Sequence, residues 1–311
     1  MNITPLPGRI YQSIPRFEPY LAAEIGVSGP AWGILYQTPE PRDHIFWHRN
    51  VWLEPFQAAF GSVSEAAKIL RGIQRNWSPL WHTRFRRGAL IREQLPRISD
   101  KPRPFPWLVP AAPMGAWTLI DDHTIIASAK CSSPFPGGCI TFIEDKETPP
   151  SRAYLKLWEA LTILRRFPRP GERCLDAGAS PGGWTWAAAQ LGAEVLAVDR
   201  SPLADRILAL PGVEYLKHDA FTLRPDETGP VDWLLCDVIC YPSRLFDWIS
   251  RWLASGLCRN IICTIKMQGL PDMETTRKFA AIPGGQVIHL WHNKHELTWI
   301  YPLAGYSSSM A

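Results

Sequence analysis

The pattern of apolar and polar positions changes character near the middle of the chain. From residue 173 onward, short apolar runs alternate with segments of helical character. We place strands at residues 173–177, 194–199, 213–217, 231–237 and 260–266, with helices between them. Strands that alternate with helices in this way predict a mostly parallel α/β sheet that is covered on both faces.

The two ends of this second half depart from the alternation. Residues 151–164 read as an amphipathic helix with Ser151 as its N-cap, and with Leu155 and Trp158 among the apolar side chains available for burial. Residues 286–292 and 297–302 are β-prone and are separated by a short polar turn. They predict an antiparallel hairpin at one edge of the sheet.

Residues 1–148 are proline-rich and have shorter apolar runs. A helix is predicted over residues 64–77, with Ser62 or Ser64 as its N-cap. Four β-prone runs, at residues 107–109, 117–120, 124–129 and 140–143, predict a small antiparallel sheet or meander. The linker is EDKETPP, which is charged and ends in two prolines. We therefore predict an α+β domain over residues 1–148 and a Rossmann-like α/β domain over residues 149–311.

Composition is that of a globular protein with two domains. The chain has 311 residues, of which 46% are hydrophobic and 20% charged, so each half can build its own core. No apolar run reaches the length of a membrane span and no leader pattern precedes the first domain, so we expect no membrane association. Seven cysteines, an odd number without regular spacing, fit a reducing compartment. We expect a cytoplasmic protein, and the sequence gives no indication of its oligomeric state.

Charge distribution is more informative than total charge. The net charge of +4 is only mildly basic, but arginines cluster directly after the predicted helix of the first half. Together with fifteen tryptophans they suit a surface that stacks on RNA bases. A solvated basic face with tryptophans in the core fits the sequence equally well. The candidate RNA-binding residues are Arg84, Arg86, Arg87, Arg92 and Arg97.

Residues 174–199, CLDAGASPGGWTWAAAQLGAEVLAVD, read as a strand, a glycine turn, a helix and a second strand that ends in a carboxylate. Gly178, Gly182 and Gly183 permit positive φ and close approach of the backbone to a ligand, and Pro181 suits the first turn of the helix. Asp199 lies about 20 residues after the first glycine, where a carboxylate can accept hydrogen bonds from both hydroxyls of a ribose. This unit therefore predicts a nucleoside ligand.

The order of the glycines, G-x-x-x-G-G, differs from the G-x-G-x-x-G of dinucleotide-binding turns. It resembles the S-adenosylmethionine loop of the FtsJ-like RNA ribose methyltransferases, which reads GAxPGG followed by an aromatic residue. A glycine turn that only packs a helix against a sheet is the alternative. The resemblance implies S-adenosylmethionine as cofactor, with Asp199 at its ribose and Asp219 at its adenine; a simple helix cap is the alternative for Asp219. The implied cofactor residues are Asp176, Gly178, Ala179, Ser180, Pro181, Gly182, Gly183, Trp184, Asp199, Asp219 and Asp237.

Four charged residues stand at or near the ends of predicted elements. Asp237 and Lys266 end apolar strand runs, at the edge where an open α/β sheet binds its ligands. Lys156 lies in the entering helix and Glu296 at the start of the last strand. The order Lys, Asp, Lys, Glu is similar to the catalytic tetrad of the FtsJ-like family, and SRAYLKLWEA is similar to its SRAxxKL segment. The resemblance implies that these four residues are catalytic.

The activity that the resemblance implies is methylation of a ribose 2′-hydroxyl in RNA. The chain is most similar to members of the family that act on a cytidine of 23S ribosomal RNA, so this RNA or a large-subunit precursor is the expected partner, and a THUMP-like first domain is expected to bind it. We expect Lys266 to take the hydroxyl proton, with its pKa lowered by Lys156, and Asp237 and Glu296 to orient the two lysines. The alternatives are a methyltransferase for transfer RNA or the messenger RNA cap, and a non-catalytic RNA-binding ribosome-assembly factor.

Two groups of possible metal ligands carry little weight. Cys236 and Cys240 are spaced C-x-x-x-C, but no second pair follows. His289, His292 and His295 have regular spacing, but on a strand and turn their side chains do not converge. We expect no metal site.

Overall fold

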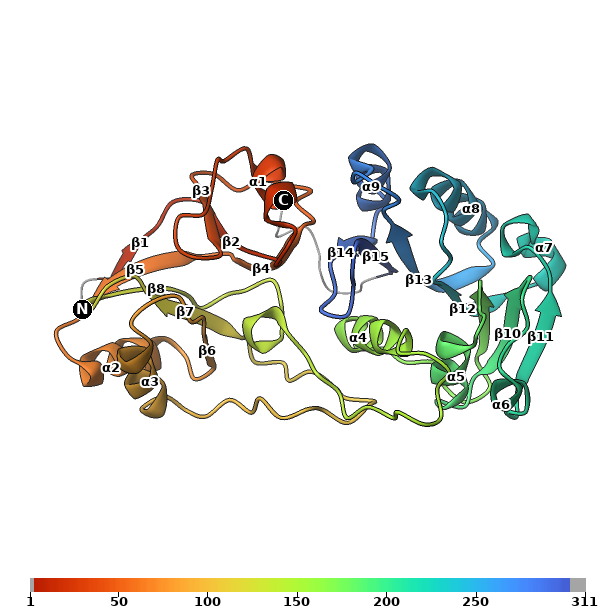
Figure 1. Cartoon of the computed structure of the whole chain (residues 1–311), viewed down its shortest axis with the longest axis horizontal. Coiled ribbons are helices and arrows are strands. Elements are labelled where there is room, and N and C mark those ends of the chain that lie inside the picture. The colour runs from red at the N-terminus through yellow and green to blue at the C-terminus, as the bar shows by residue number, and fades with distance from the viewer. Residues whose placement is uncertain (1–2, 303–311) are drawn as a thin grey trace. The chain divides into compact units, whose positions relative to one another are not determined.

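The computed structural model describes residues 3–302, and the chain divides into two compact units (Figure 1). The first unit comprises Met1–Arg103 and Val109–Thr141, and the second comprises Pro104–Leu108 and Phe142–Ala311. The short segment Pro104–Leu108 thus belongs with the second unit, although it lies within the first in sequence. Residues 303–311 of the predicted second domain lie outside the described part of the chain.

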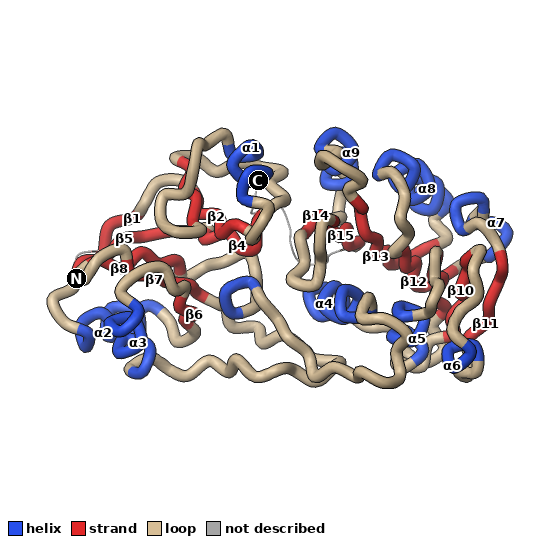
Figure 2. Tube along the Cα trace, viewed as in Figure 1, coloured by secondary structure: helices blue, strands red, loops and turns tan. Residues whose placement is uncertain are grey.

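The first unit is an α+β structure with two sheets (Figure 2). Its five-stranded sheet has the order β1 (Ile3–Pro5), β5 (Pro55–Ala59), β8 (Thr124–Ser128), β7 (Gly115–Leu119) and β6 (Trp77–Pro79). Its three-stranded sheet has the order β3 (Leu35–Thr38), β2 (Arg9–Ser13) and β4 (His48–Trp52). The helices are α1 (Glu18–Ile25), α2 (Val63–Ile73) and α3 (Phe85–Glu93), with a 3-10 turn at Pro136–Gly138.

The predicted helix of this unit is confirmed as α2, which is shorter than expected. It begins after Ser62, whose hydroxyl accepts a hydrogen bond from the backbone N–H of Glu65 at 3.2 Å. It ends before Trp77, because the chain there enters β6 and the tryptophan packs into the core. The predicted runs at residues 117–120 and 124–129 are confirmed as β7 and β8, which pair antiparallel. Residues 107–109 and 140–143 form no strand, and β6 runs parallel to β7, so the rest of the predicted antiparallel sheet is wrong.

The second unit contains one seven-stranded sheet that confirms the predicted Rossmann-like architecture. The order is β11 (Val213–Lys217), β10 (Glu194–Asp199), β9 (Arg173–Ala177), β12 (Val231–Cys236), β13 (Cys258–Lys266), β15 (Glu296–Tyr301) and β14 (Gln286–Ile288). The first five strands in this order are parallel, whereas β15 is antiparallel to both of its neighbours. The predicted parallel sheet with a terminal hairpin is therefore correct.

Helices cover both faces of this sheet. In Figure 1, α4, α5 and α6 lie on one side and α7, α8 and α9 on the other. Their bounds are Tyr154–Leu164, Gly183–Ala189, Asp205–Leu208, Pro225–Thr228, Pro242–Ser255 and Met273–Ala280, with a 3-10 turn, η2, at Ala220–Thr222. No helix within residues 3–302 is both long and apolar enough to cross a membrane.

Helix α4 differs from its prediction in two ways. It is buried on nearly all sides rather than on one face, and it begins after Ala153 without a side-chain cap from Ser151. Part of its cover comes from the segment Pro104–Leu108, whose Phe105 ring stacks on Trp158 with ring centroids 4.4 Å apart. A local sequence pattern cannot reveal a cover that comes from a distant part of the chain.

Candidate active site

Two lysines and two carboxylates meet at one edge of the second unit's sheet. In the pairing of β13 with β15, Lys266 stands opposite Glu296, and its Nζ lies 2.5 Å from Glu296 Oε2 and 2.6 Å from Asp237 Oδ1. Lys156, from α4, contacts both oxygens of Asp237 at 2.8 and 2.7 Å and Glu296 Oε1 at 3.0 Å. The four predicted residues thus form a closed ring, called here the charge ring, in which cations and anions alternate.

The side chains of the charge ring are largely buried, and each charged group is paired with groups of opposite charge. Each carboxylate contacts both ammonium groups, which offsets the large cost of burying a lone charge. Lys156 faces three carboxylate oxygens, as many as it has N–H donors. Lys266 faces two, and its side chain is 15% exposed against 10% for Lys156. Within residues 3–302, Lys266 therefore retains one N–H with no carboxylate to receive it, so it is the lysine suited to contact a ligand.

Electrostatics of the charge ring contradict one expectation. Burial lowers the pKa of Lys266, but the carboxylates of Asp237 and Glu296 together outweigh burial and hold the pKa above its ordinary value. Burial raises the pKa of Asp237, but Lys156 and Lys266 together hold it below its ordinary value. The prediction that Lys156 lowers the pKa of Lys266 is wrong, because the two carboxylates in direct contact with Lys266 raise that pKa.

Thr264 is a member of this site that the sequence prediction missed. Its hydroxyl donates to Asp237 Oδ1 at 2.5 Å. Thr264 lies two residues before Lys266 on β13, and alternate residues of a strand point to the same face. The two-residue spacing between Thr264 and Lys266 in a predicted strand was the sequence signal that could have identified Thr264.

Glu159 is a second missed residue, one helical turn after Lys156 on α4. Its buried carboxylate accepts hydrogen bonds from the backbone N–H groups of Trp291 at 2.7 Å and His292 at 3.0 Å, and lies 2.7 Å from His292 Nδ1. These bonds tie α4 to the turn that precedes Glu296. Glu159 therefore fixes the relative positions of the elements that carry Lys156 and Glu296.

The histidines of the last hairpin have separate partners. His292 lies against Glu159, and His289 Nε2 lies 3.0 Å from the carbonyl oxygen of Lys294. Cys236 and Cys240 are free thiols. Across residues 3–302, no three His, Cys, Asp or Glu side chains are grouped so that they could hold a metal ion.

The glycine turn between β9 and α5 uses its glycines for two different reasons. Gly178 and Gly182 have φ of 76° and 110°, a region that favours glycine. A Cβ on Gly178 would also lie 2.0 Å from Val238 Cγ2. Gly183 has no such backbone requirement, contrary to expectation; a Cβ there would lie 2.7 Å from Ser151 Oγ. The glycines of the turn therefore allow β9, α5 and the loop after β12 to pack closely together.

Asp199 closes this turn from the neighbouring strand. Its two oxygens accept the backbone N–H groups of Ser180 at 3.0 Å and Ser201 at 2.8 Å, and each keeps further acceptor capacity. Pro181 precedes α5 rather than standing in its first turn, since the helix begins at Gly183, so that expectation is wrong. Trp184 is buried and donates its indole N–H to the carbonyl of Ala153 at 2.9 Å.

Asp176 and Asp219 have protein partners. Asp176 is buried beneath the turn and accepts a hydrogen bond from the Thr185 hydroxyl at 2.6 Å; burial raises its pKa to about 7. Asp219 Oδ1 caps η2 by accepting from the N–H of Phe221 at 3.0 Å, as the helix-cap alternative expects. Its Oδ2 pairs with Arg200 and, at 3.3 Å, with Arg244.

The five arginines predicted to bind RNA lie on and around α3 in the first unit. Arg84 pairs with Asp122 at 3.0 Å and Arg92 with Asp100 at 3.4 Å, and the Arg87 guanidinium lies 5.4 Å from the centroid of the Phe60 ring. Arg86 and Arg97 are exposed and form no ion pair within residues 3–302. The arginines therefore differ in how far they are already engaged.

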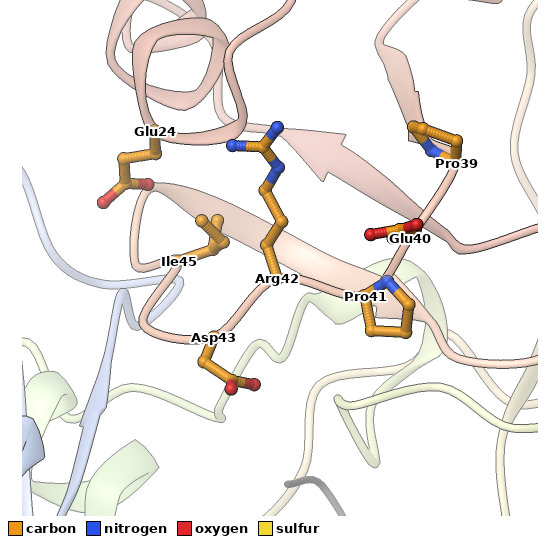
Figure 3. Close-up of a pocket in the computed structure, with 7 residues that line it drawn as sticks. All are labelled: Glu24, Pro39, Glu40, Pro41, Arg42, Asp43 and Ile45. Atoms are coloured by element: carbon orange, nitrogen blue, oxygen red, sulfur yellow. The ribbon is translucent and has the colours of Figure 1, made fainter.

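A recess of about 390 Å³ lies elsewhere in the first unit (Figure 3). Three carboxylates and one guanidinium line it, and Figure 3 shows the Arg42 side chain extending toward the helix that carries Glu24. Glu24 accepts the backbone N–H groups of Phe46 and Trp47. None of the predicted site residues belongs to it. Its lining is Glu24, Pro39, Glu40, Pro41, Arg42, Asp43 and Ile45.

Part of the second unit matches a known protein family. Residues 149–268 match the family model described as FtsJ-like methyltransferase, a range that includes the glycine turn, Asp237 and Lys266. The second unit thus contains an FtsJ-like methyltransferase domain.

The curated relatives of this chain share one name. The chain is 38% identical over 182 residues to the ribosomal RNA large subunit methyltransferase M of Azoarcus sp. (strain BH72), covering 53% of this chain and 49% of that protein. It is 33% identical over 223 residues to the protein of the same name from Xanthomonas axonopodis pv. citri (strain 306), covering 69% of this chain and 60% of that protein. The chain spans about half the length of the first of these relatives and 60% of the second.

Proposed function

We propose that this chain is an S-adenosylmethionine-dependent methyltransferase of ribosomal RNA, acting on a ribose 2′-hydroxyl. The observation that carries the proposal is the charge ring of Lys156, Asp237, Lys266 and Glu296 within an FtsJ-like domain. The ring stands at the carboxyl ends of β12 and β13, the edge at which open α/β sheets bind ligands. The names of the relatives support ribosomal RNA of the large subunit as substrate, and within it we propose a cytidine of 23S ribosomal RNA or of its precursor.

The glycine turn and Asp199 fit S-adenosylmethionine. Gly178 leaves the backbone of the turn without a side chain, and a Cβ there would collide with Val238 from the loop after β12. Asp199 stands beside this backbone with acceptor capacity for ribose hydroxyls. When bound, the cofactor supplies an electrophilic methyl group on sulfur. Ala179, Ser180, Pro181 and Gly182 would line it, with Asp219 at the adenine once an arginine releases one of its oxygens.

The charge ring would align the attacking oxygen. Lys266 is held as an ammonium group, and its remaining N–H can donate to the ribose 2′-oxygen and fix it for in-line attack on the methyl group. As the new bond from this oxygen to carbon forms, the bond from carbon to sulfur would break, the sulfur would leave as a neutral thioether, and the oxygen would lose its proton. Because Lys266 is protonated, that proton passes into the ring, where the carboxylates of Asp237 and Glu296 can accept it. Holding two reactants in line can contribute several kcal/mol to lowering the barrier.

The first unit would bind the RNA outside the reacting nucleotide. The arginines around α3 support this role, as do the exposed side chains of Phe85 and Leu90 on the same helix. Cations next to exposed apolar groups suit single-stranded RNA, which offers both phosphates and base faces. A THUMP-like character of this unit belongs to the same proposal.

Methyl transfer can be tested directly. The purified chain is incubated with labelled S-adenosylmethionine and large-subunit ribosomal RNA that lacks modifications, and the digested nucleosides are analysed by mass spectrometry. We expect label in 2′-O-methylcytidine. Label on a base, or in transfer RNA or capped RNA in preference to ribosomal RNA, would contradict the proposal, as would absence of transfer while the cofactor binds.

Lys266→Ala is the matched variant for this assay. We expect at least a 100-fold loss of kcat, on the order of what a positioned proton-handling or aligning group supplies, with cofactor affinity close to that of the wild type. Affinity for S-adenosylmethionine is measured by titration calorimetry and reports at the same time that the variant is folded. A variant with normal turnover would remove Lys266 from the mechanism.

A further inference from the structure

Two loops next to the charge ring expose large apolar side chains. The loop after β12 carries Ile239 and Tyr241, which are 80% and 67% exposed, and the loop after β13 carries Leu270, which is 87% exposed. Strands β12 and β13 are parallel neighbours, with Cys236 paired to Cys263, so both loops leave the sheet at the edge where Asp237 and Lys266 stand. Exposed apolar groups gathered on adjacent loops indicate a binding surface. We call Ile239, Tyr241 and Leu270 the apolar lip.

The apolar lip is bordered by cations. Arg244 follows Tyr241 by three residues, in the first turn of α8, and its guanidinium lies 4.6 Å from the centroid of the Phe221 ring. Arg244 and Arg200 share a single carboxylate oxygen of Asp219, and both arginine side chains are more than half exposed. Two cations with one anion leave this border net positive. The surface therefore suits a ligand that is anionic and also has an apolar face.

The apolar lip and the charge ring are close in space. Burial raises the pKa of the Cys240 thiol to about 11, and the positive charges of Arg244 and Lys266 oppose that rise. Cys240 lies between Ile239 and Tyr241 in the chain, so the loop of the lip is within electrostatic range of the ring lysine. In a nucleotide, the base and the 2′-hydroxyl are attached to adjacent carbons of one ribose. A hydroxyl held by Lys266 thus brings its own base to the neighbouring loops.

We propose that the apolar lip receives the base of the nucleotide that is methylated, unstacked from the rest of the RNA, with Tyr241 as its stacking platform and Arg244 on an adjacent phosphate. This inference rests on the proposed function and specifies how the same site recognises its substrate. An exposed aromatic ring supplies a stacking face for an unpaired base, and an arginine three residues further along the chain supplies a cation for a phosphate of the same RNA strand.

The test compares Tyr241→Ala with Tyr241→Phe in steady-state methylation of unmodified large-subunit ribosomal RNA. Stacking on an aromatic side chain is worth about 5- to 150-fold in affinity, so we expect Tyr241→Ala to lower kcat/KM for RNA by a factor in that range. Tyr241→Phe keeps the ring and should retain the wild-type value. The control is Leu216→Ala, which removes an exposed apolar side chain from β11, at the far edge of the sheet.

Parallel measurements separate the possible occupants of the lip. Cofactor affinity, measured by titration calorimetry, should be the same in all variants. If Tyr241→Ala lost as much affinity for the cofactor as it lost in kcat/KM for RNA, the cofactor would be the occupant and the inference would be overturned. A wild-type kcat/KM of Tyr241→Ala on naked RNA would also overturn the inference. If the variant were then defective only on ribosomal particles, the occupant of the lip would be a protein partner.

Binding of short single-stranded RNA by fluorescence anisotropy distinguishes this inference from the proposed function. If the wild type binds RNA but transfers no methyl group, the proposed function fails while the lip is still tested by the affinity of Tyr241→Ala. We expect that affinity to be reduced about 5- to 150-fold. An unchanged affinity, or a wild type that binds no RNA, would overturn the inference.

Discussion

At the scale of single residues, the two lysines of the charge ring are not equivalent. Lys156 directs its ammonium group at three carboxylate oxygens, whereas Lys266 reaches two and is the more exposed. The division gives Lys156 a structural role within the ring and leaves Lys266 to meet the ligand. Asp237 is the centre of the arrangement, because it contacts both lysines and also Thr264.

Removal of the Thr264 hydroxyl tests how much its hydrogen bond to Asp237 contributes to activity. Thr264→Val keeps the shape of the side chain but takes a hydrogen bond from a buried carboxylate. A bond to a charged group contributes about 1.5–3 kcal/mol, and we expect kcat to fall roughly 10-fold as Asp237 becomes free to turn. Thr264→Ser, which restores the hydroxyl, should recover most of the activity in the same assay. Equal activity of the Val and Ser variants would contradict a role for this bond.

Asp176 gives a prediction about pH. Its pKa is about 7 in the folded chain against 3.8 for the ordinary side chain, so the folded state binds a proton that the unfolded state releases. The free energy of unfolding should therefore fall as pH rises from about 4 to about 7. Asp176→Asn keeps a neutral side chain at all pH values, and urea denaturation should show a flatter profile for it over this range. A profile as steep as that of the wild type would show that another group is responsible.

At the scale of elements, the glycine turn shows how packing and backbone geometry act together. Gly178 has both a left-handed φ and a neighbour that leaves no room for Cβ, whereas Gly183 has only the second constraint. The same turn receives Asp199 from the adjacent strand, so β9, β10 and α5 are held at one point. A cofactor bound there would be surrounded by rigid elements.

Two alanine variants separate backbone strain from collision. Gly178→Ala places Cβ 2.0 Å from Val238 at φ 76°, while Gly171→Ala has a similar φ of 80° and nothing within 4 Å. We expect Gly171→Ala to lose about 1 kcal/mol of stability from strain alone. Gly178→Ala should lose more than this and bind the cofactor weakly. Thermal denaturation and calorimetry measure the two effects, and equal losses of stability would rule out the collision.

Helix α4 illustrates the same principle over a longer distance in sequence. Its Trp158 receives Phe105 and its Glu159 receives the turn at His292, so residues from both ends of the second unit's chain fix the helix that carries Lys156. The position of Lys156 therefore depends on contacts that lie outside the helix itself.

At the scale of the whole molecule, the arginines around α3 give the first unit its testable role. Arg86 and Arg97 have no ion pair within residues 3–302, whereas Arg84 and Arg92 each have a carboxylate partner. We expect Arg86→Ala/Arg97→Ala to weaken RNA binding more than Arg84→Ala/Arg92→Ala does. The slope of log affinity against log salt should fall by about 0.7 for each lost phosphate contact with single-stranded RNA. Anisotropy titrations at several salt concentrations measure both, and a larger effect of the paired arginines would contradict the prediction.

The sequence alone predicted the strands of the second unit and the four charged residues that meet in the charge ring. Buried strands such as β10 and β13 are short apolar runs, and the glycine turn and the four charged residues are visible at their ends. Local preferences and periodicity suffice for these features, because each depends on residues near one another in the chain. The first unit was less predictable, since its short strands pair in a mixed sheet whose order no local pattern encodes.

The tertiary structure alone decided how the site is held and charged. Folding placed two carboxylates against Lys266 and so raised a pKa that the order of charges along the chain had suggested would be lowered. It also brought Phe105 onto Trp158, and Glu159 onto the turn before Glu296. Such contacts join residues far apart in sequence, and their energies depend on burial and on distances of a few ångströms, which only the packed chain defines.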